Sequence, residues 1–195
     1  MRCGLCGLIA TSGVCEDCLA EFKPIESPVE ALSTGPVDFA ICLYHYQGRA
    51  SQAVRRLKYD RVTSLADPLA RLMATKAREL TIPRYDLVCP VPIHWRRLCW
   101  RGFNQAELLA RDLAARSQQR ALLRIRATRP QVRLNPQERA INLVGAFRAN
   151  PSVYGQSVLL VDDVLTSGST AQACAEALKV AGAEKVGILT LTKGG

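Results

Sequence analysis

The sequence predicts an α/β protein whose sheet is mostly parallel and flanked by helices. Apolar runs of strand length occur at 85–92, 157–162 and 186–191, and stretches with helical periodicity lie between them. The last interval holds a helix at 169–181, so its two strands form a crossover unit, which joins parallel strands. At 195 residues the chain has room for one main domain and a small appendage.

Residues 1–22 form the expected appendage, a module built around two Cys-x-x-Cys pairs. The four cysteines are Cys3, Cys6, Cys15 and Cys18. Thiolates at this spacing can close a tetrahedral site, so we predict a zinc ribbon that holds structural Zn²⁺. A redox dithiol is the alternative interpretation, although redox chemistry needs one pair and the chain has two. Residues 23–36, which contain three prolines, are expected to be a linker to the main domain at 37–195.

The first half of the main domain alternates strands and helices. Residues 37–46 are rich in aromatic and aliphatic side chains, as a strand would be. A short basic helix is expected at 47–59. A longer helix is expected at 64–80, with Ser64 as its N-cap and leucines near a 3.6-residue period. The apolar run at 85–92 follows as a buried strand.

The next segment is predicted to be largely irregular. Residues 94–102 are interpreted as a basic loop, and a helix is expected to begin at Asn104 and continue to about Arg116. Residues 117–150 show little sustained periodicity and are predicted to be a long loop with some short strand. A loop of this length is usually functional or disordered.

Positive charge is concentrated in one part of the chain. The net charge is +9, and the stretch from His94 to Arg148 holds twelve arginines, three acids and no lysine. A guanidinium matches a phosphate with two parallel hydrogen bonds, so this composition favours phosphate binding. A genome-wide preference for arginine would give the same composition. Trp95 and Trp100 flank two of the arginines, and aromatic residues among basic ones also suit single-stranded nucleic acid.

The segment 158–170 is the strongest indication of a ligand site. A buried strand is followed by Asp162 and Asp163 and then by a glycine-containing turn at the start of a helix. The turn residues are Thr166, Ser167, Gly168, Ser169 and Thr170. Backbone amides at such a helix start bind anions, and the P-loop lysine is absent. Carboxylates would repel a bare phosphate, so we expect ribose hydroxyls between them and a phosphate. An acidic helix cap is the alternative.

A second strand end carries Arg101 and Gly102, which precede the helix expected from Asn104. Amides at that helix start, together with Arg101, suit a pyrophosphate. A magnesium ion that bridges pyrophosphate and ribose hydroxyls would fit the same arrangement, because Mg²⁺ takes oxygen ligands. His94 is a candidate general base, although no partner for it is apparent in the sequence.

These segments together resemble the ComF family of phosphoribosyltransferase-type proteins, and the resemblance extends over nearly the whole chain. The segments that carry it are the four cysteines, Leu57-Lys58-Tyr59, Pro90-Val91-Pro92, Arg101-Gly102-Phe103-Asn104-Gln105, Pro130-Gln131 with Arg139 and Asn142, and residues 158–170. Residues 158–170 look like the phosphoribosyl pyrophosphate (PRPP) motif of type I phosphoribosyltransferases. Ser167 departs from the threonine that many transferases have there, but it keeps the hydroxyl.

The resemblance implies a type I phosphoribosyltransferase-like sheet with PRPP and Mg²⁺ at the strand ends. The implied PRPP-binding residues are Asp162, Asp163, Val164, Thr166, Ser167, Gly168, Ser169, Thr170, Arg101 and Gly102. The implied catalytic residues are Asp162, Asp163, Arg101 and Arg139. Residues 124–139 would lie where such enzymes keep a mobile catalytic loop.

Two functions follow as expectations. The first is phosphoribosyl transfer to an unknown acceptor in a protein that the resemblance links to DNA uptake and competence. The second is a non-catalytic PRPP sensor or competence protein that binds single-stranded DNA or other competence proteins. The chain has neither an apolar run of bilayer length nor an apparent signal peptide, so no membrane span is expected and a cytoplasmic location is predicted.

Overall fold

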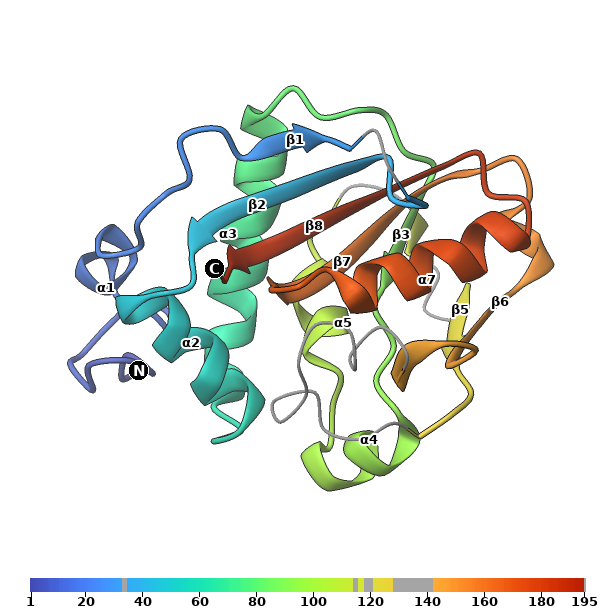
Figure 1. The fold of residues 1–195 in the computed structure, drawn as a ribbon. Coiled ribbons are helices and arrows are strands. Elements are labelled where there is room, and N and C mark those ends of the chain that lie inside the picture. Colours follow the sequence, from blue (N-terminus) through green and yellow to red (C-terminus); the bar gives the residue numbers. More distant parts are fainter. Residues whose placement is uncertain (33–34, 114–115, 118–120, 128–141, 195) are drawn as a thin grey trace.

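The computed structural model describes residues 1–32, 35–113, 116–117, 121–127 and 142–194 (Figure 1). A six-stranded sheet with the order β1-β2-β8-β7-β3-β4 forms its centre. The strands are β1 Val29–Ala31, β2 Phe39–His45, β3 Leu87–Pro90, β4 Arg116–Ser117, β7 Ser157–Leu165 and β8 Lys185–Lys193. Each neighbouring pair is parallel except β1 with β2. The predicted α/β fold with a mostly parallel sheet is therefore confirmed.

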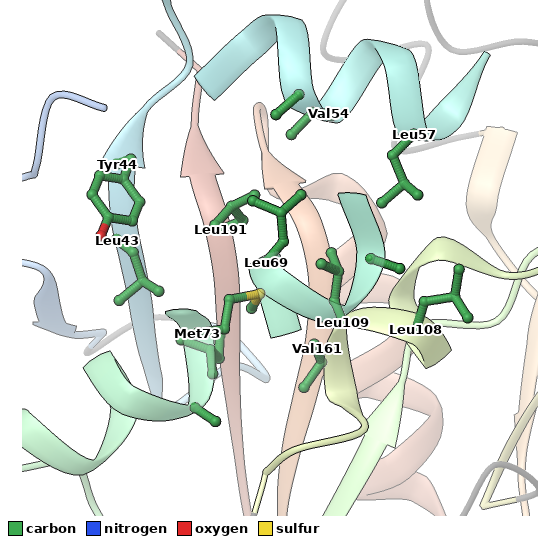
Figure 2. Close-up of a cluster of buried hydrophobic side chains, with 14 of the residues drawn as sticks. Leu43, Tyr44, Val54, Leu57, Leu69, Met73, Leu108, Leu109, Val161 and Leu191 are labelled. Atoms are coloured by element: carbon green, nitrogen blue, oxygen red, sulfur yellow. The ribbon is translucent and has the colours of Figure 1, made fainter. Parts of the chain in front are cut away.

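Apolar side chains alternate along the central strands and fill a core on each face of the sheet. Leu159 and Val161 of β7 belong to one core, whereas Val158 and Leu160 belong to the other. The first core contains α2 Gly48–Lys58, α3 Ala66–Glu79 and α5 Gln105–Ala110, whose side chains meet the sheet in Figure 2. The second core is covered by α7 Ser169–Val180 and by the strand pair β5 Leu122–Arg124 and β6 Phe147–Ala149.

The cysteine-rich N-terminus packs into the first core. Leu5, Val14 and Phe22 are buried there, and α1 Glu16–Ala20 contacts α2. The approach is closest at Gly13, where a Cβ atom would lie 1.6 Å from the carbonyl oxygen of Ser64. Only glycine fits at this point, so the N-terminal segment is held firmly against the turn before α3. The boundary between appendage, linker and main domain stays a prediction.

Two helix starts differ from those predicted. Ser64 lies inside a short 3₁₀ turn, η1 Thr63–Leu65, and α3 begins after it at Ala66 without a side-chain cap. The prediction of Ser64 as N-cap is therefore wrong. Asn104 does cap α5, because its Oδ1 accepts a hydrogen bond of 3.1 Å from the Ala106 amide. That helix ends at Ala110 rather than near residue 116.

Residues 94–102, interpreted above as a basic loop, instead contain a helix, α4 Trp95–Arg101. His94 caps its start, since Nδ1 accepts a hydrogen bond of 3.3 Å from the Arg96 amide. Gly102 ends it in the left-handed region at φ +88°, a conformation that glycine adopts without strain. Both ends are therefore stabilised by specific caps, although the helix has no buried apolar stripe.

Several further boundaries also differ. β1 lies within the predicted linker 23–36 and extends the sheet at its edge. β7 continues through both aspartates to Leu165. In the region 117–150 the structure describes β5 and β6, whose bounds are given above, and the short turn η3 Pro151–Val153 follows it. The proposed loop residues Pro130, Gln131 and Arg139 lie outside the described residues. In the part of the chain that is described, no helix is long and apolar enough to cross a bilayer.

Candidate functional site

A cleft opens where β3 and β7 end. Ligands of parallel α/β sheets bind at this edge of the sheet. Its walls come from the end of α2, from α4, from the start of α5, from β5, and from the segment that joins β7 to α7. The polar lining residues are Lys58, Arg97, Arg101, Gln105, Arg124, Asp162, Asp163, Thr166, Ser167, Ser169 and Thr170. Most of the predicted site residues therefore lie around one cleft.

The segment between β7 and α7 forms one wall of the cleft. Gly168 takes φ +73° as the N-cap residue of α7, and the hydroxyl oxygens of Ser167 and Ser169 lie 2.9 Å apart. The amides at the start of this twelve-residue helix carry its positive dipole end. This wall is thus built to accept an anion. Val164 also lines the cleft, from within the strand.

Asp163 is the buried member of the aspartate pair. Its Oδ2 lies 2.7 Å from the Nζ of Lys58, and its Oδ1 accepts a hydrogen bond of 3.4 Å from Nε2 of Gln105. Burial alone would raise the pKa of this carboxyl, but the Lys58 charge and these hydrogen bonds lower it below its usual value. Asp163 is therefore a carboxylate that is held ionised inside the protein.

Asp162 is half-buried, and its Oδ1 accepts a hydrogen bond of 2.8 Å from the Asp163 amide. Burial raises the pKa of its carboxyl, and the neighbouring Asp163 charge raises it further. The two adjacent aspartates thus differ in environment. Both line the cleft, but Asp163 is fixed by protein partners, whereas the carboxyl of Asp162 gains a proton more easily.

Lys58 is a site residue that sequence reasoning missed. It ends α2, and burial would lower the pKa of its ammonium group, but the Asp163 and Asp162 carboxylates raise it. Its side chain lies one helical turn beyond the buried Val54, on the apolar face of α2. A lysine on an otherwise apolar helix face was the signal that could have identified it.

Arg101, the last residue of α4, also lines the cleft and is only 6% exposed. Its Nη1 donates a hydrogen bond to Oε1 of Gln105, and its guanidinium lies 5.9 Å from the ring centroid of Tyr59. Its Nε–H has no hydrogen-bond partner among the described residues. A buried donor without a partner costs free energy, so this group is suited to a ligand acceptor.

Other positions around the site contribute less than predicted or lie elsewhere. Gly102 ends α4, is exposed, and does not line the cleft. His94 uses Nδ1 as a helix cap, so the general-base interpretation gains no support. Arg124 of β5 does line the cleft, and burial together with the charge of Arg97 lowers the pKa of its guanidinium to about 10. With Lys58 and three arginines facing two aspartates, the cleft carries a net positive charge.

The four N-terminal cysteines form a second constellation. Their sulfur atoms all lie within 4.8 Å of one another, and those of Cys6 and Cys15 are 3.7 Å apart. Four sulfurs at about 2.3 Å from a tetrahedral Zn²⁺ ion would be separated by about 3.8 Å. Burial would raise the pKa of the Cys3 thiol, but backbone amides of Cys6, Cys15 and Leu5 lower it to about 6. The cluster can therefore hold a metal ion, and its donor set suits zinc.

Comparison with known proteins agrees with this arrangement. A family model described as a phosphoribosyl transferase domain matches residues 101–195, which include Arg101 and the segment between β7 and α7. The DNA utilization protein YhgH of Escherichia coli O6:H1, strain CFT073, is 33% identical over 204 residues, covering 98% of this chain and 83% of its own. Competence protein F of Haemophilus influenzae is 29% identical over 170 residues, covering 80% of this chain and 73% of its own.

Among solved structures, the orotate phosphoribosyltransferase of Mycobacterium tuberculosis H37Rv covers 91% of this chain and 81% of its own, with 17% identity and a TM-score of 0.41. The similarity to YhgH extends over most of both chains, and the phosphoribosyl transferase match includes most of the residues that line the cleft. This chain therefore belongs to the ComF family of phosphoribosyltransferase-type proteins, whose relatives are named for competence and DNA utilization.

Proposed function

We propose that the cleft binds PRPP with Mg²⁺ and that the protein transfers the phosphoribosyl group to an acceptor. The observation that carries this proposal is the pairing of two different anion-binding walls across a pair of aspartates. The start of α7 supplies amides and hydroxyls, and Arg101 supplies a buried guanidinium with an unpartnered Nε–H. PRPP has an anionic group at each end of its ribose, so its charge distribution matches the cleft.

In this proposal the 5-phosphate binds the loop and helix start at 166–170. The hydroxyl groups of the ribose then face Asp162 and Asp163, which accept hydrogen bonds from them. The geometry of Asp163 suits this role because Lys58 and Gln105 already fix its carboxylate. A preorganised acceptor loses little conformational freedom when the ligand binds.

The pyrophosphate binds Arg101, with Arg97 and Arg124 contributing positive charge from the same cleft. As the bond to pyrophosphate breaks, negative charge builds on the leaving group, and fixed cationic donors stabilise it. The oxygen donor of Asp162 suits Mg²⁺, which would neutralise further charge on the pyrophosphate. Arg139, which lies outside the described residues, remains a proposed catalytic residue.

We further propose that Cys3, Cys6, Cys15 and Cys18 hold a structural Zn²⁺ ion. Four sulfur ligands close the coordination sphere and leave no position for substrate, so the ion stabilises the N-terminal segment rather than taking part in transfer. None of the eight cysteines, all of which lie in the described part of the chain, forms a disulfide, which agrees with a reducing compartment such as the cytoplasm.

The test of this proposal is calorimetric titration of the protein with PRPP and Mg²⁺. We expect binding in the wild type and loss of at least tenfold in affinity in the double variant Asp162→Asn with Asp163→Asn, because each lost charged hydrogen bond contributes roughly 1.5–3 kcal/mol. The exposed Asp67→Asn is the matched control and should bind normally. Absence of PRPP binding in the wild type would refute the proposal. Pyrophosphate release with candidate acceptors then tests transfer, and binding without release would favour a sensor.

The surface of α4 favours a second function, binding of single-stranded DNA. Trp95 and Trp100 are 61% and 56% exposed. Arg96 lies 5.4 Å from the ring centroid of Trp95, and Arg61 lies 5.2 Å from that of Trp100. Exposed aromatic rings beside guanidinium groups can stack on bases while the cations contact the phosphates.

Titration of a dye-labelled oligothymidylate with the protein, followed by the fluorescence anisotropy of the dye, tests this second function. We expect an affinity that falls steeply and log-linearly with salt, because phosphate contacts release counterions. Trp95→Ala with Trp100→Ala should weaken binding at least tenfold, since stacking contributes roughly 1–3 kcal/mol per base. Tyr154→Ala, which removes another exposed aromatic side chain, should have no effect. Equal affinity in all three proteins would exclude α4 as the binding surface.

A further inference from the structure

Gln105 connects Arg101 to the aspartate pair of the cleft. Its Oε1 accepts a hydrogen bond from Nη1 of Arg101, and its Nε2 donates one to Oδ1 of Asp163 at 3.4 Å. Asp163 continues the connection to Lys58 at 2.7 Å. Gln105, Arg101 and Asp163 are 4%, 6% and 1% exposed, so water competes little for these contacts.

The side-chain amide is the group that this position requires. A guanidinium offers donors only, and an ionised carboxylate offers acceptors only. A residue between them must therefore accept on one side and donate on the other, which fixes the orientation of the Gln105 amide. A glutamate here would present a second negative charge to Asp163, and an apolar side chain would leave both partners unsatisfied.

The backbone of Gln105 is anchored as firmly as its side chain. It is the first residue of α5 and follows Asn104. The Oδ1 of Asn104 accepts a hydrogen bond from the Ala106 amide, and its Nδ2 donates one of 3.1 Å to the carbonyl of Val91, just after β3. The side-chain amide of Gln105 thus extends from a backbone position that a hydrogen bond connects to the end of β3.

We propose that Gln105 is a positioning residue that couples Arg101 to Asp163 within the cleft. It orients Arg101 toward an anionic group and Asp163 toward a diol, so that a ligand carrying both is bound by a preorganised site. This inference rests on the proposed function for the identity of the ligand. It adds that the pyrophosphate and ribose subsites are not independent, and that the contribution of Gln105 to anion binding requires Asp163.

The test is a double-mutant cycle on the affinity for pyrophosphate alone, which in this proposal contacts Arg101 but neither Gln105 nor Asp163. Four full-length proteins are titrated calorimetrically: wild type, Gln105→Met, Asp163→Ala and the double variant. Removing the Asp163 charge acts through space in both backgrounds and cancels in the cycle. Gln172→Met, the same substitution on the exposed face of α7, is the matched control. Thermal unfolding of each protein reports folding separately.

We expect Gln105→Met to weaken pyrophosphate binding about fivefold when Asp163 is present and less than twofold when it is absent, a coupling of at least about 2.5-fold, at the lower end of those that double-mutant cycles measure. An equal loss in both backgrounds, or no loss in either, would overturn the coupling. If Asp163→Ala fails to fold, Asp163→Asn replaces it, and the same sign of coupling is required, although smaller, because its neutral oxygen accepts a weaker hydrogen bond.

Titration of the wild type with PRPP separates this inference from the proposed function. PRPP binding with an additive cycle, or without any binding of pyrophosphate, refutes the role of Gln105 and leaves the ligand assignment intact. No binding of PRPP refutes the proposed function, whereas the pyrophosphate cycle still decides the coupling.

Discussion

Replacing Lys58 with methionine tests the buried ion pair on which the cleft depends. The Lys58 ammonium lies 2.7 Å from the Asp163 carboxylate, and the two side chains are 19% and 2% exposed. Removing one partner of such a pair leaves an uncompensated charge in the interior, which costs about 3–5 kcal/mol. Because the lysine retains some exposure, we take the lower end, about 3 kcal/mol. Methionine keeps the length and the helix propensity, so the loss reports the charge.

The assay is thermal and urea unfolding, with an exposed ion pair of the same nitrogen–oxygen distance as the control. Lys76 lies 2.7 Å from Glu79, but these side chains are 42% and 53% exposed. We expect Lys58→Met to lower the melting temperature by about 6–12 °C, from roughly 2–4 °C per kcal/mol for a domain of this size. Lys76→Met should change the stability by less than about 1 kcal/mol, because exposed pairs contribute little. Similar losses in the two variants would refute the argument from burial.

Acidification gives a second measurement with a defined sign. In the wild type the pKa of Asp163 lies below 3.8, so its stabilising contribution is present above that pH and is lost as the pH falls through the lowered pKa. Without Lys58, burial should raise the pKa of Asp163 above 3.8. Protonation of Asp163 then removes the unpaired buried charge of the variant as the pH falls. The difference in free energy of unfolding between the wild type and Lys58→Met should therefore shrink between pH 7 and pH 4. A difference that does not change with pH would contradict this account.

Three further predictions concern the N-terminal segment and the thiols. Elemental analysis should find one zinc per chain, lost in Cys15→Ser and retained in Cys99→Ser, whose side chain lies outside the cluster. Gly13→Ala should destabilise the protein by about 1–3 kcal/mol in urea unfolding, because its Cβ would meet the Ser64 carbonyl, and an unchanged midpoint would show that the segment docks differently. At pH 8 iodoacetamide should alkylate the exposed Cys99 first, which mass spectrometry would detect. Burial raises the pKa of Cys89 to about 12 and should protect it.

The sequence predicted those elements whose apolar residues have a clear period. β7, α7 and β8 lie in the expected places because the apolar residues that each buries in the core form a regular pattern within its own segment. α4 was missed because caps at His94 and Gly102 stabilise it rather than a buried apolar stripe. β1 was missed because it is a three-residue edge strand, whose pairing depends on a neighbour that the local pattern does not reveal.

The residues of the candidate site likewise fall into those that one local segment reveals and those that only the folded chain brings together. Asp162, Asp163 and the loop at 166–170 are contiguous, so their chemistry was apparent from one segment. Asp163 contacts Lys58 and Gln105, which are far from it in the sequence, and such pairings arise only when the sheet and its helices assemble. Lys58 was thus visible as a polar residue on an apolar helix face, but its pairing with Asp163 was not.

The position of β8 in the sheet has a consequence for synthesis of the protein. β8 lies between β2 and β7 and follows both in the chain, with Phe39 of β2 paired to Gly187. While residues up to 184 leave the ribosome, β2 is an apolar strand without its parallel neighbour, and the two parts of the sheet remain unjoined. Exposed strand edges of this kind associate with other chains, and distant pairings form slowly. A nascent chain that stalls before β8 should therefore aggregate or require a chaperone, whereas release of β8 joins the two parts of the sheet into one.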